Sequence, residues 1–142
     1  MPTISERLLS SAIHIGEMPS GSLLLMANAH YPWFLIVPCG EFVEWIDIPT
    51  ETQQRMLTDI NSLSQFLLHD SALKVGKINI GAIGNIVPQF HLHIVGRHTE
   101  DPAWPGPVWG HPEHRDYAGG EMEALVERLT NSVSDFQNAG IR

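Results

Sequence analysis

The chain alternates between short apolar runs and polar breaks that contain glycine or proline, and this pattern predicts a sheet of short strands. Two apolar runs come first, at residues 22–27 and 33–37, and a polar segment ending in Pro32 separates them. Apolar runs of this length between breakers are typical of adjacent buried strands. Two further strands are predicted over residues 74–82 and 90–95.

Two longer segments have the three-and-four spacing of apolar residues that predicts an amphipathic helix, and a short, weak helix is predicted before them, over residues 7–13. The first long helix covers residues 50–69 and begins with the capping-box sequence Thr50-Glu51-Thr52-Gln53, in which the Thr and Gln side chains satisfy backbone donors. The second covers residues 121–137. Their apolar stripes are Met56, Ile60, Leu63 and Leu67 in the first and Met122, Leu125, Leu129, Val133 and Phe136 in the second.

This order of elements predicts an α+β fold, with a largely antiparallel meander sheet of about five strands packed with two main helices. A length of 142 residues fits one compact unit, so residues 1–142 are treated as a single domain. Within it, residues 97–118 are predicted to be an irregular loop rich in proline, and residues 119–142 to hold the C-terminal helix. A loop of that length in a compact domain is usually functional or poorly ordered.

Composition and charge narrow the class of protein. Apolar residues make up 43% of the chain and charged residues 17%, which excludes a disordered protein. The net charge of −8 would repel the phosphates of a nucleic acid duplex, so no such partner is expected. The single cysteine, Cys39, cannot form an internal disulfide or a cysteine zinc site, which favours a reducing compartment. Because no apolar stretch is long enough for a membrane span, we expect a soluble, cytoplasmic protein without a membrane partner.

The candidate chemistry lies on the strand predicted over residues 90–95. Side chains of a strand alternate between its two faces, so the residues just before and within this strand separate into an apolar and a polar set. The apolar set can pack onto a helix, whereas the polar set admits three interpretations. It can be a solvent-facing side with incidental histidines, a metal site in which two imidazoles share one ion, or a catalytic face. The polar set is Gln89, His91 and His93, and the apolar set is Phe90, Leu92 and Ile94.

This strand belongs to the longer segment Gly84-Asn85-Ile86-Val87-Pro88-Gln89-Phe90-His91-Leu92-His93-Ile94-Val95-Gly96-Arg97. The segment resembles the signature of the histidine triad (HIT) family of nucleotide hydrolases and transferases, His-φ-His-φ-His-φ-φ, where φ is apolar, preceded by a glycine and an amide residue. The order of elements is also similar over residues 14–97. The resemblance implies a HIT-like fold and a homodimer, for which the apolar stripe of residues 56–67 could form the seam.

The chain departs from the family pattern at two positions. By this alignment, Gln89 occupies the first triad position, and Trp33 occupies the place of an accessory histidine on an earlier strand. The middle histidine, which carries the family's chemistry, is present as His91. A glutamine can donate and accept hydrogen bonds but cannot titrate, so Gln89 could hold a phosphate oxygen or orient the neighbouring imidazole.

The resemblance implies covalent catalysis on a dinucleoside polyphosphate or a nucleoside phosphoramidate. The imidazole of His91 would attack the α-phosphorus, and water would then release a nucleoside monophosphate from the nucleotidyl-histidine intermediate. His93 and Gln89 would flank the phosphate oxygens, and Asn85 with nearby backbone N–H groups would stabilise the developing charge. The family pattern also assigns Asn28 and Asn79 to the substrate pocket. No cofactor or protein-bound metal is required, although Mg²⁺ could accompany the substrate.

Two alternatives from other classes remain open at this stage. The missing histidines are compatible with a nucleotide-binding module that has little turnover, and the His-x-His pattern is compatible with a metal protein of another fold. In the proline-rich loop, Trp104 and Trp109 could stack on a base or could pin the loop to the core. Arg97 is expected to form a structural ion pair.

Overall fold

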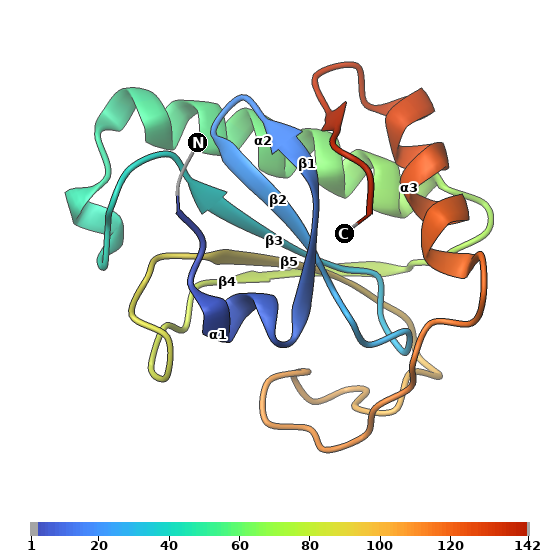
Figure 1. Cartoon of the computed structure of the whole chain (residues 1–142). Helices are drawn as coiled ribbons and strands as arrows, with labels where there is room; N and C mark the ends of the chain where they lie inside the picture. The colour runs from blue at the N-terminus through green and yellow to red at the C-terminus, as the bar shows by residue number, and fades with distance from the viewer. Residues whose placement is uncertain (1–2, 142) are drawn as a thin grey trace.

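A six-stranded antiparallel sheet forms the centre of the computed structural model, which describes residues 3–141. The sheet order is β4-β5-β3-β2-β1-β6, so the first three strands form a meander and β5 returns beside β3 (Figure 1). The predicted α+β class with a largely antiparallel sheet is confirmed. The strands are β1 (Ala12–Met18), β2 (Gly21–Met26), β3 (Trp33–Pro38), β4 (Lys77–Gly81), β5 (Leu92–Arg97) and β6 (Gln137–Asn138).

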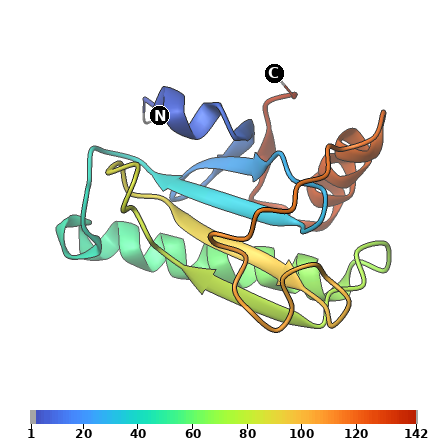
Figure 2. The same cartoon turned by 90° about the horizontal axis from the view of Figure 1, so that it is seen from below.

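Two long helices and the apolar side of β5 form the main core on one face of the sheet. The helices are α2 (Thr50–His69) and α3 (Glu121–Ser132), and Figure 2 shows α2 running along the sheet. The apolar set of the candidate strand lies in this core, as predicted. The buried residues that meet there include Met56, Leu63 and Leu67 from α2, Met122, Leu125 and Leu129 from α3, and Phe90, Leu92 and Ile94.

A second, smaller apolar cluster covers the opposite face of the sheet. It contains Leu8 from the short helix α1 (Glu6–Leu9), Trp33 and Leu35 from β3, and Val108 from the long loop. Figure 2 accordingly shows α1 and α2 on opposite sides of the sheet. The candidate histidines therefore lie on a face that α1 and the loop cover, whereas the two long helices stabilise the other face.

The first long helix begins where predicted, but its capping box does not form as expected. The side-chain amide of Gln53 donates to the carbonyls of Trp45 and Ile48, at 3.0 and 3.1 Å. These carbonyls belong to a 3-10 turn, η1 (Trp45–Asp47), and its following residue, which bring acceptors within reach of the amide. The side chain of Gln53 therefore bonds to the turn before the helix and not to the backbone donor that a capping box would satisfy.

The apolar stripe of α2 is not available as a dimer seam, which corrects that part of the prediction. Met56, Leu63 and Leu67 are fully buried against the sheet of their own chain. A stripe that is already covered within the protomer cannot also cover a second copy. Leu57, which lies beside this stripe, is exposed.

The C-terminal helix is shorter than predicted, and a sixth strand follows it. α3 ends at Ser132, and β6 pairs with the outer edge of β1 through Gly16 and Asn138. Phe136 stays buried, as its place in the apolar stripe predicted, but it lies at the end of the turn between α3 and β6. A side chain on Gly16 would collide with the carbonyl of Gln137, so the glycine permits this close pairing.

The N-terminal region also differs from the prediction. The short helix is α1 (Glu6–Leu9), and β1 (Ala12–Met18), which was not predicted, follows it at once. The sequence of β1 is a poor match to a strand pattern because a bulge between His14 and Gly16 interrupts the alternation of faces. Within the described part of the chain, every helix is too short or too polar to cross a lipid bilayer.

Candidate active site

Trp33 and His93 form the buried side of the candidate site. Indole Nε1 of Trp33, on β3, donates a hydrogen bond of 2.9 Å to Nδ1 of His93, on the adjacent strand β5. An indole N–H can only donate, so Nδ1 of His93 must accept and carries no proton. The neutral ring of His93 therefore carries its proton on Nε2.

Burial keeps the ring of His93 neutral. The residue is only 5% exposed, and desolvation, with a smaller contribution from the neighbouring His91, lowers the pKa of His93 to about 3. Burial disfavours the charged form of an imidazole because the charge loses its hydration. At neutral pH, His93 is thus a fixed hydrogen-bond donor through Nε2.

His91 has the opposite arrangement of its two ring nitrogens. Its Nδ1 lies 2.8 Å from the backbone carbonyl oxygen of Gln89, and a carbonyl can only accept. Nδ1 of a neutral His91 therefore carries the proton, and the lone pair of Nε2 is left for chemistry. The rings of His91 and His93 lie with centroids 5.0 Å apart at an interplanar angle of 65°. The structure thus brings the two predicted histidines into contact, with complementary tautomers.

The side chain of Gln89 is held by the N-terminal segment. Its Nε2 donates to the carbonyl of Thr3 at 2.7 Å, and its Oε1 accepts from the backbone N–H of Ser5 at 2.8 Å. Both ends of the amide thus have backbone partners, while the main-chain carbonyl of the same residue faces His91. Contact between Gln89 and a phosphate oxygen stays a prediction.

The three predicted asparagines have separate surroundings. Asn28 accepts from the backbone N–H of Arg115 at 3.3 Å and so fastens the end of the long loop. Asn79, on β4, accepts from Nη1 of Arg97 at 2.8 Å. Asn85 is exposed in the segment between β4 and β5. Asn28 and Asn79 are thus already hydrogen-bonded within the chain, and the substrate contacts of all three stay predictions.

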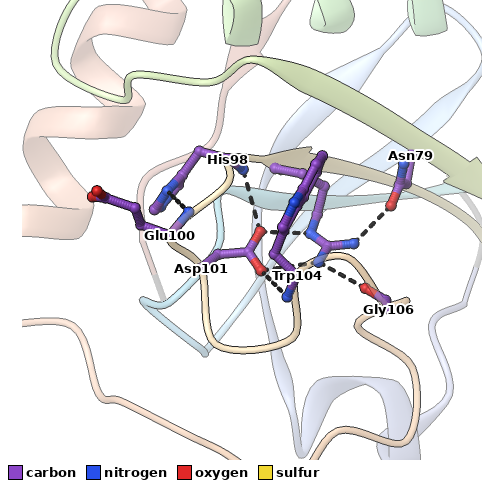
Figure 3. A network of polar contacts seen from close by, with 7 residues as sticks. Asn79, His98, Glu100, Asp101, Trp104 and Gly106 are labelled. Carbon is purple, nitrogen blue, oxygen red and sulfur yellow. Dashed lines mark hydrogen bonds and ion pairs between the residues drawn. The ribbon is translucent and has the colours of Figure 1, made fainter.

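A buried ion pair joins the end of β5 to the long loop, as predicted for Arg97. Its Nε donates to Asp101 at 2.7 Å and its Nη2 donates to the same carboxylate at 2.9 Å, so the pair is bidentate. Nη2 also donates to the carbonyl of Gly106 at 2.8 Å. Figure 3 shows Asp101, Gly106 and Asn79 arranged around the same guanidinium. Burial alone would raise the pKa of Asp101, but hydrogen bonds from Arg97 and from the backbone of His98 hold it below its usual value.

The two tryptophans of the loop have different surroundings. The ring of Trp104 packs on the guanidinium of Arg97, whose Cζ lies 5.6 Å from the ring centroid, so this indole pins the loop. The ring of Trp109 lies against His93, with centroids 5.4 Å apart at 79°. Trp109 also packs over Gly81, where an added Cβ would be 3.2 Å from the indole. Trp109 is therefore the residue that brings the loop to the candidate site.

Two cavities of the structure lie away from this site. One, of about 640 Å³, lies between the end of α2 and the residues after α3, and another, of about 580 Å³, lies between the loop and α3. The described lining residues of both exclude the histidine pair. Among residues 3–141, no group of three or more His, Cys, Asp or Glu side chains is arranged to hold a metal ion.

Two features of the site were not predicted from the sequence. Trp33 was recognised only as a departure from the family pattern, whereas the structure shows it as the donor that fixes the tautomer of His93. Thr3 and Ser5 contact Gln89 through backbone atoms, which no side-chain pattern reports. The sign of this role in the sequence was the tryptophan at the place of the accessory histidine. Both side chains can hydrogen-bond to a group on the neighbouring strand.

The depressed pKa of His93 predicts that the protein loses stability in mild acid. An unfolded histidine takes up its proton near 6.5, whereas His93 in the folded protein does so at about 3. Between these values the unfolded state binds more protons, so the free energy of unfolding falls as the pH falls, by up to about 1.4 kcal/mol per unit. The free energy of unfolding measured with urea should fall by about 2 kcal/mol between pH 6.5 and pH 5 because of this group. The glutamine of His93→Gln cannot titrate, so this variant should lack that part of the pH dependence. An identical pH dependence of the free energy of unfolding in the variant and the native protein would contradict the depressed pKa of His93.

Comparison with known proteins places the chain in a family. The HIT domain model matches residues 10–100. A histidine triad protein from Bradyrhizobium japonicum is 36% identical, with a TM-score of 0.87 over 92% of this chain and 97% of that one. Histidine triad proteins from Sinorhizobium meliloti and Marinobacter aquaeolei are 32% and 33% identical, with TM-scores of 0.85 and 0.86. They cover 92% and 96% of this chain, and 96% and 99% of their own. No curated protein gives a significant match. The chain belongs to the HIT domain family of nucleotide-binding proteins.

Proposed function

We propose that this protein is a hydrolase or transferase that cleaves at the α-phosphate of a nucleotide through a nucleotidyl-histidine intermediate on His91. The proposal depends mainly on the hydrogen bond from Nδ1 of His91 to the carbonyl of Gln89, since it leaves a lone pair on Nε2. A neutral imidazole with a free lone pair is a nucleophile at neutral pH. Nε2 attacks the α-phosphorus, the bond to the leaving group breaks, and water then attacks the same phosphorus and returns Nε2 to its free state.

His93 supports this step as a neutral donor. With Nδ1 engaged by Trp33, its Nε2–H is the group that can donate to an oxygen of the transferred phosphoryl group. A donor that is already oriented stabilises the charge of the transition state without reorganisation. Asn85 and the backbone N–H groups around it would add to this stabilisation in the proposed complex, and Asn28 and Asn79 would line the pocket.

The three positions of the triad face favour phosphate over amine as the leaving group. Gln89 cannot titrate, His93 is neutral at neutral pH, and His91 is the nucleophile. None of them supplies a proton readily, and an amine needs one to leave whereas a phosphate leaves as an anion. We therefore place dinucleoside polyphosphates ahead of nucleoside phosphoramidates as substrates. The reaction needs no cofactor, and Mg²⁺ would act by neutralising the substrate's phosphates.

The test is a hydrolysis screen with dinucleoside polyphosphates of increasing length and with adenosine phosphoramidates of aromatic and aliphatic amines. We expect release of a nucleoside monophosphate, with higher kcat/KM for the polyphosphates. Binding of AMP without cleavage of any substrate would instead favour a nucleotide-binding module with little turnover. A preference for aliphatic phosphoramidates would overturn the argument about the leaving group.

We also propose that the protein forms a homodimer and acts in the cytoplasm. The proposed dimer interface is the edge strand β4 and not the apolar stripe of α2. Ile80 on β4 is 50% exposed, and Leu57 and Ile86 are also exposed large apolar residues. An edge strand with apolar side chains is a template for pairing with another chain.

Sedimentation equilibrium should give twice the monomer mass of 15.8 kDa, and Ile80→Glu should weaken the dimer. Ile46→Glu, at a site 85% exposed on η1, serves as the control. A monomer at all micromolar concentrations would rule the dimer out.

A further inference from the structure

The segment Thr3–Ser5 is attached to the candidate site through a single side chain. The amide of Gln89 donates to the carbonyl of Thr3 at 2.7 Å and accepts from the N–H of Ser5 at 2.8 Å. These residues lie more than eighty positions apart in the chain. One amide group thus supplies both a donor and an acceptor to a neighbouring backbone, as a strand partner would.

The peptide of Gln89 is held on both sides. On one side the side-chain amide is held by the N-terminal segment, and on the other the N–H of Phe90 donates to the carbonyl of Phe42 at 2.8 Å. Phe90 is buried in the main core. The carbonyl between these two anchors is the one that accepts from Nδ1 of His91. Its position, and with it the ring of His91, depends on both anchors.

The N-terminal segment has an anchor of its own. The carbonyl of Ser5 accepts from the N–H groups of Leu8 and Leu9, both at 3.1 Å, at the start of α1. Leu8 is buried in the smaller apolar cluster with Trp33. The segment is therefore fixed to the same face of the sheet as the histidine pair, and it can transmit that fixed position to Gln89.

We propose that the segment Thr3–Ser5 is a positioning element of the active site, which acts through Gln89 on the orientation and tautomer of His91. Gln89 is then a positioning residue rather than a contact to the substrate's phosphate. The kinetic part of this inference rests on the proposed function, whereas the part about the tautomer does not. Glutamine suits the role because its amide offers a donor and an acceptor at once, which a carboxylate or an aliphatic side chain does not.

The test disrupts the hydrogen bond from the backbone of Ser5 to Gln89. Ser5 has a φ of −54°, which proline adopts, so Ser5→Pro keeps this backbone angle. It deletes the donating N–H and places a ring carbon against Oε1 of Gln89, so the contact is lost. Ser5→Ala removes only the side chain, which accepts from the N–H of Arg7 at 3.3 Å, and should lose less. Ser10→Ala, outside the segment, should behave as the wild type. Gln89→Ala removes both bonds.

The first readout is the tautomer of His91, measured by ¹⁵N NMR of the imidazole. We expect the Nδ1–H form in the wild-type protein and in Ser10→Ala, and a mixture of tautomers in Ser5→Pro and Gln89→Ala. This measurement needs no substrate, so it remains informative even if every candidate substrate fails. An unchanged tautomer in both Ser5→Pro and Gln89→Ala would overturn the inference.

The second readout is a double-mutant cycle on the best substrate. Ser5→Pro should lower kcat roughly three- to tenfold or more with little change in KM, because it removes at least one neutral hydrogen bond to Gln89. Gln89→Ala should lower kcat about tenfold or more, and adding Ser5→Pro to it should have almost no further effect, because both act along one route. If Gln89 instead contacts phosphate directly, Gln89→Ala will be impaired while Ser5→Pro keeps wild-type kcat, and the inference is wrong. Effects that multiply would also overturn it.

Discussion

Replacing His91 with alanine should abolish cleavage at phosphorus while the fold and AMP binding stay largely intact. His91 is the group whose Nε2 is left free by the hydrogen bond at Nδ1, so its loss removes the covalent route. Loss of a nucleophile costs on the order of 10⁴-fold or more in other covalent enzymes, far above the cost of one lost hydrogen bond. Steady-state kcat on the best substrate from the screen measures the effect.

Two further measurements make this prediction specific. Rapid quench of the native protein with labelled substrate should trap a nucleotide on His91, and the same experiment on His91→Ala should trap none. His93→Gln provides the matched comparison, because it replaces the neighbouring ring but keeps the nucleophile, and it should retain measurable activity. Turnover by His91→Ala close to that of the native protein would show that another group attacks the phosphorus.

Arg97→Met should strongly destabilise the fold. The guanidinium is 1% exposed and joins Asp101 in a bidentate pair, so its removal leaves a buried carboxylate without its counter-charge. Breaking one side of a buried ion pair costs about 3–5 kcal/mol. For a chain of this size, such a loss lowers the melting temperature by on the order of 10 °C. Methionine keeps most of the side-chain volume, so lost packing makes only a small contribution.

The control for Arg97 is an ion pair on the surface. Arg55 lies 3.6 Å from Glu51 on α2, and both side chains are exposed. Exposed pairs contribute about 0–1 kcal/mol, so Arg55→Ala should change the free energy of unfolding by less than about 1 kcal/mol. Urea unfolding of both variants compares them directly. If Arg97→Met were as mild as Arg55→Ala, the buried pair would have no net role in stability.

The sequence was sufficient for the features that depend on local pattern. Alternation along residues 89–94 placed Phe90 and Leu92 in the core and the two histidines on the other face, and the structure agrees. The stripe of α2 was predicted in the same way, because its three-and-four spacing from Met56 to Leu67 matches the period of a helix and not that of a strand. Arg97 was also predicted to form a structural ion pair, from its place just past the two histidines, and its buried guanidinium pairs with Asp101.

The features that escaped prediction depend on contacts between distant backbone segments. β6 has two residues, too few for any alternation to show, and its pairing depends on the space left by Gly16. The hold of Thr3 and Ser5 on Gln89 uses main-chain groups that every residue carries. The tautomers of the histidines likewise depend on partners from other positions, Trp33 among them. Such information appears only when the chain is folded.

The network around Arg97 also has a consequence for the thermodynamics of binding. Asp101 accepts from the backbone N–H groups of His98 and Trp104, at 3.2 and 2.8 Å, so bonds within the chain itself order the loop that carries Trp109. The conformational entropy of this loop is therefore lost during folding and not when a ligand arrives. A ligand that reaches Trp109 should bind with little loop rearrangement, and its association rate should be limited by encounter and orientation rather than by closure of the loop.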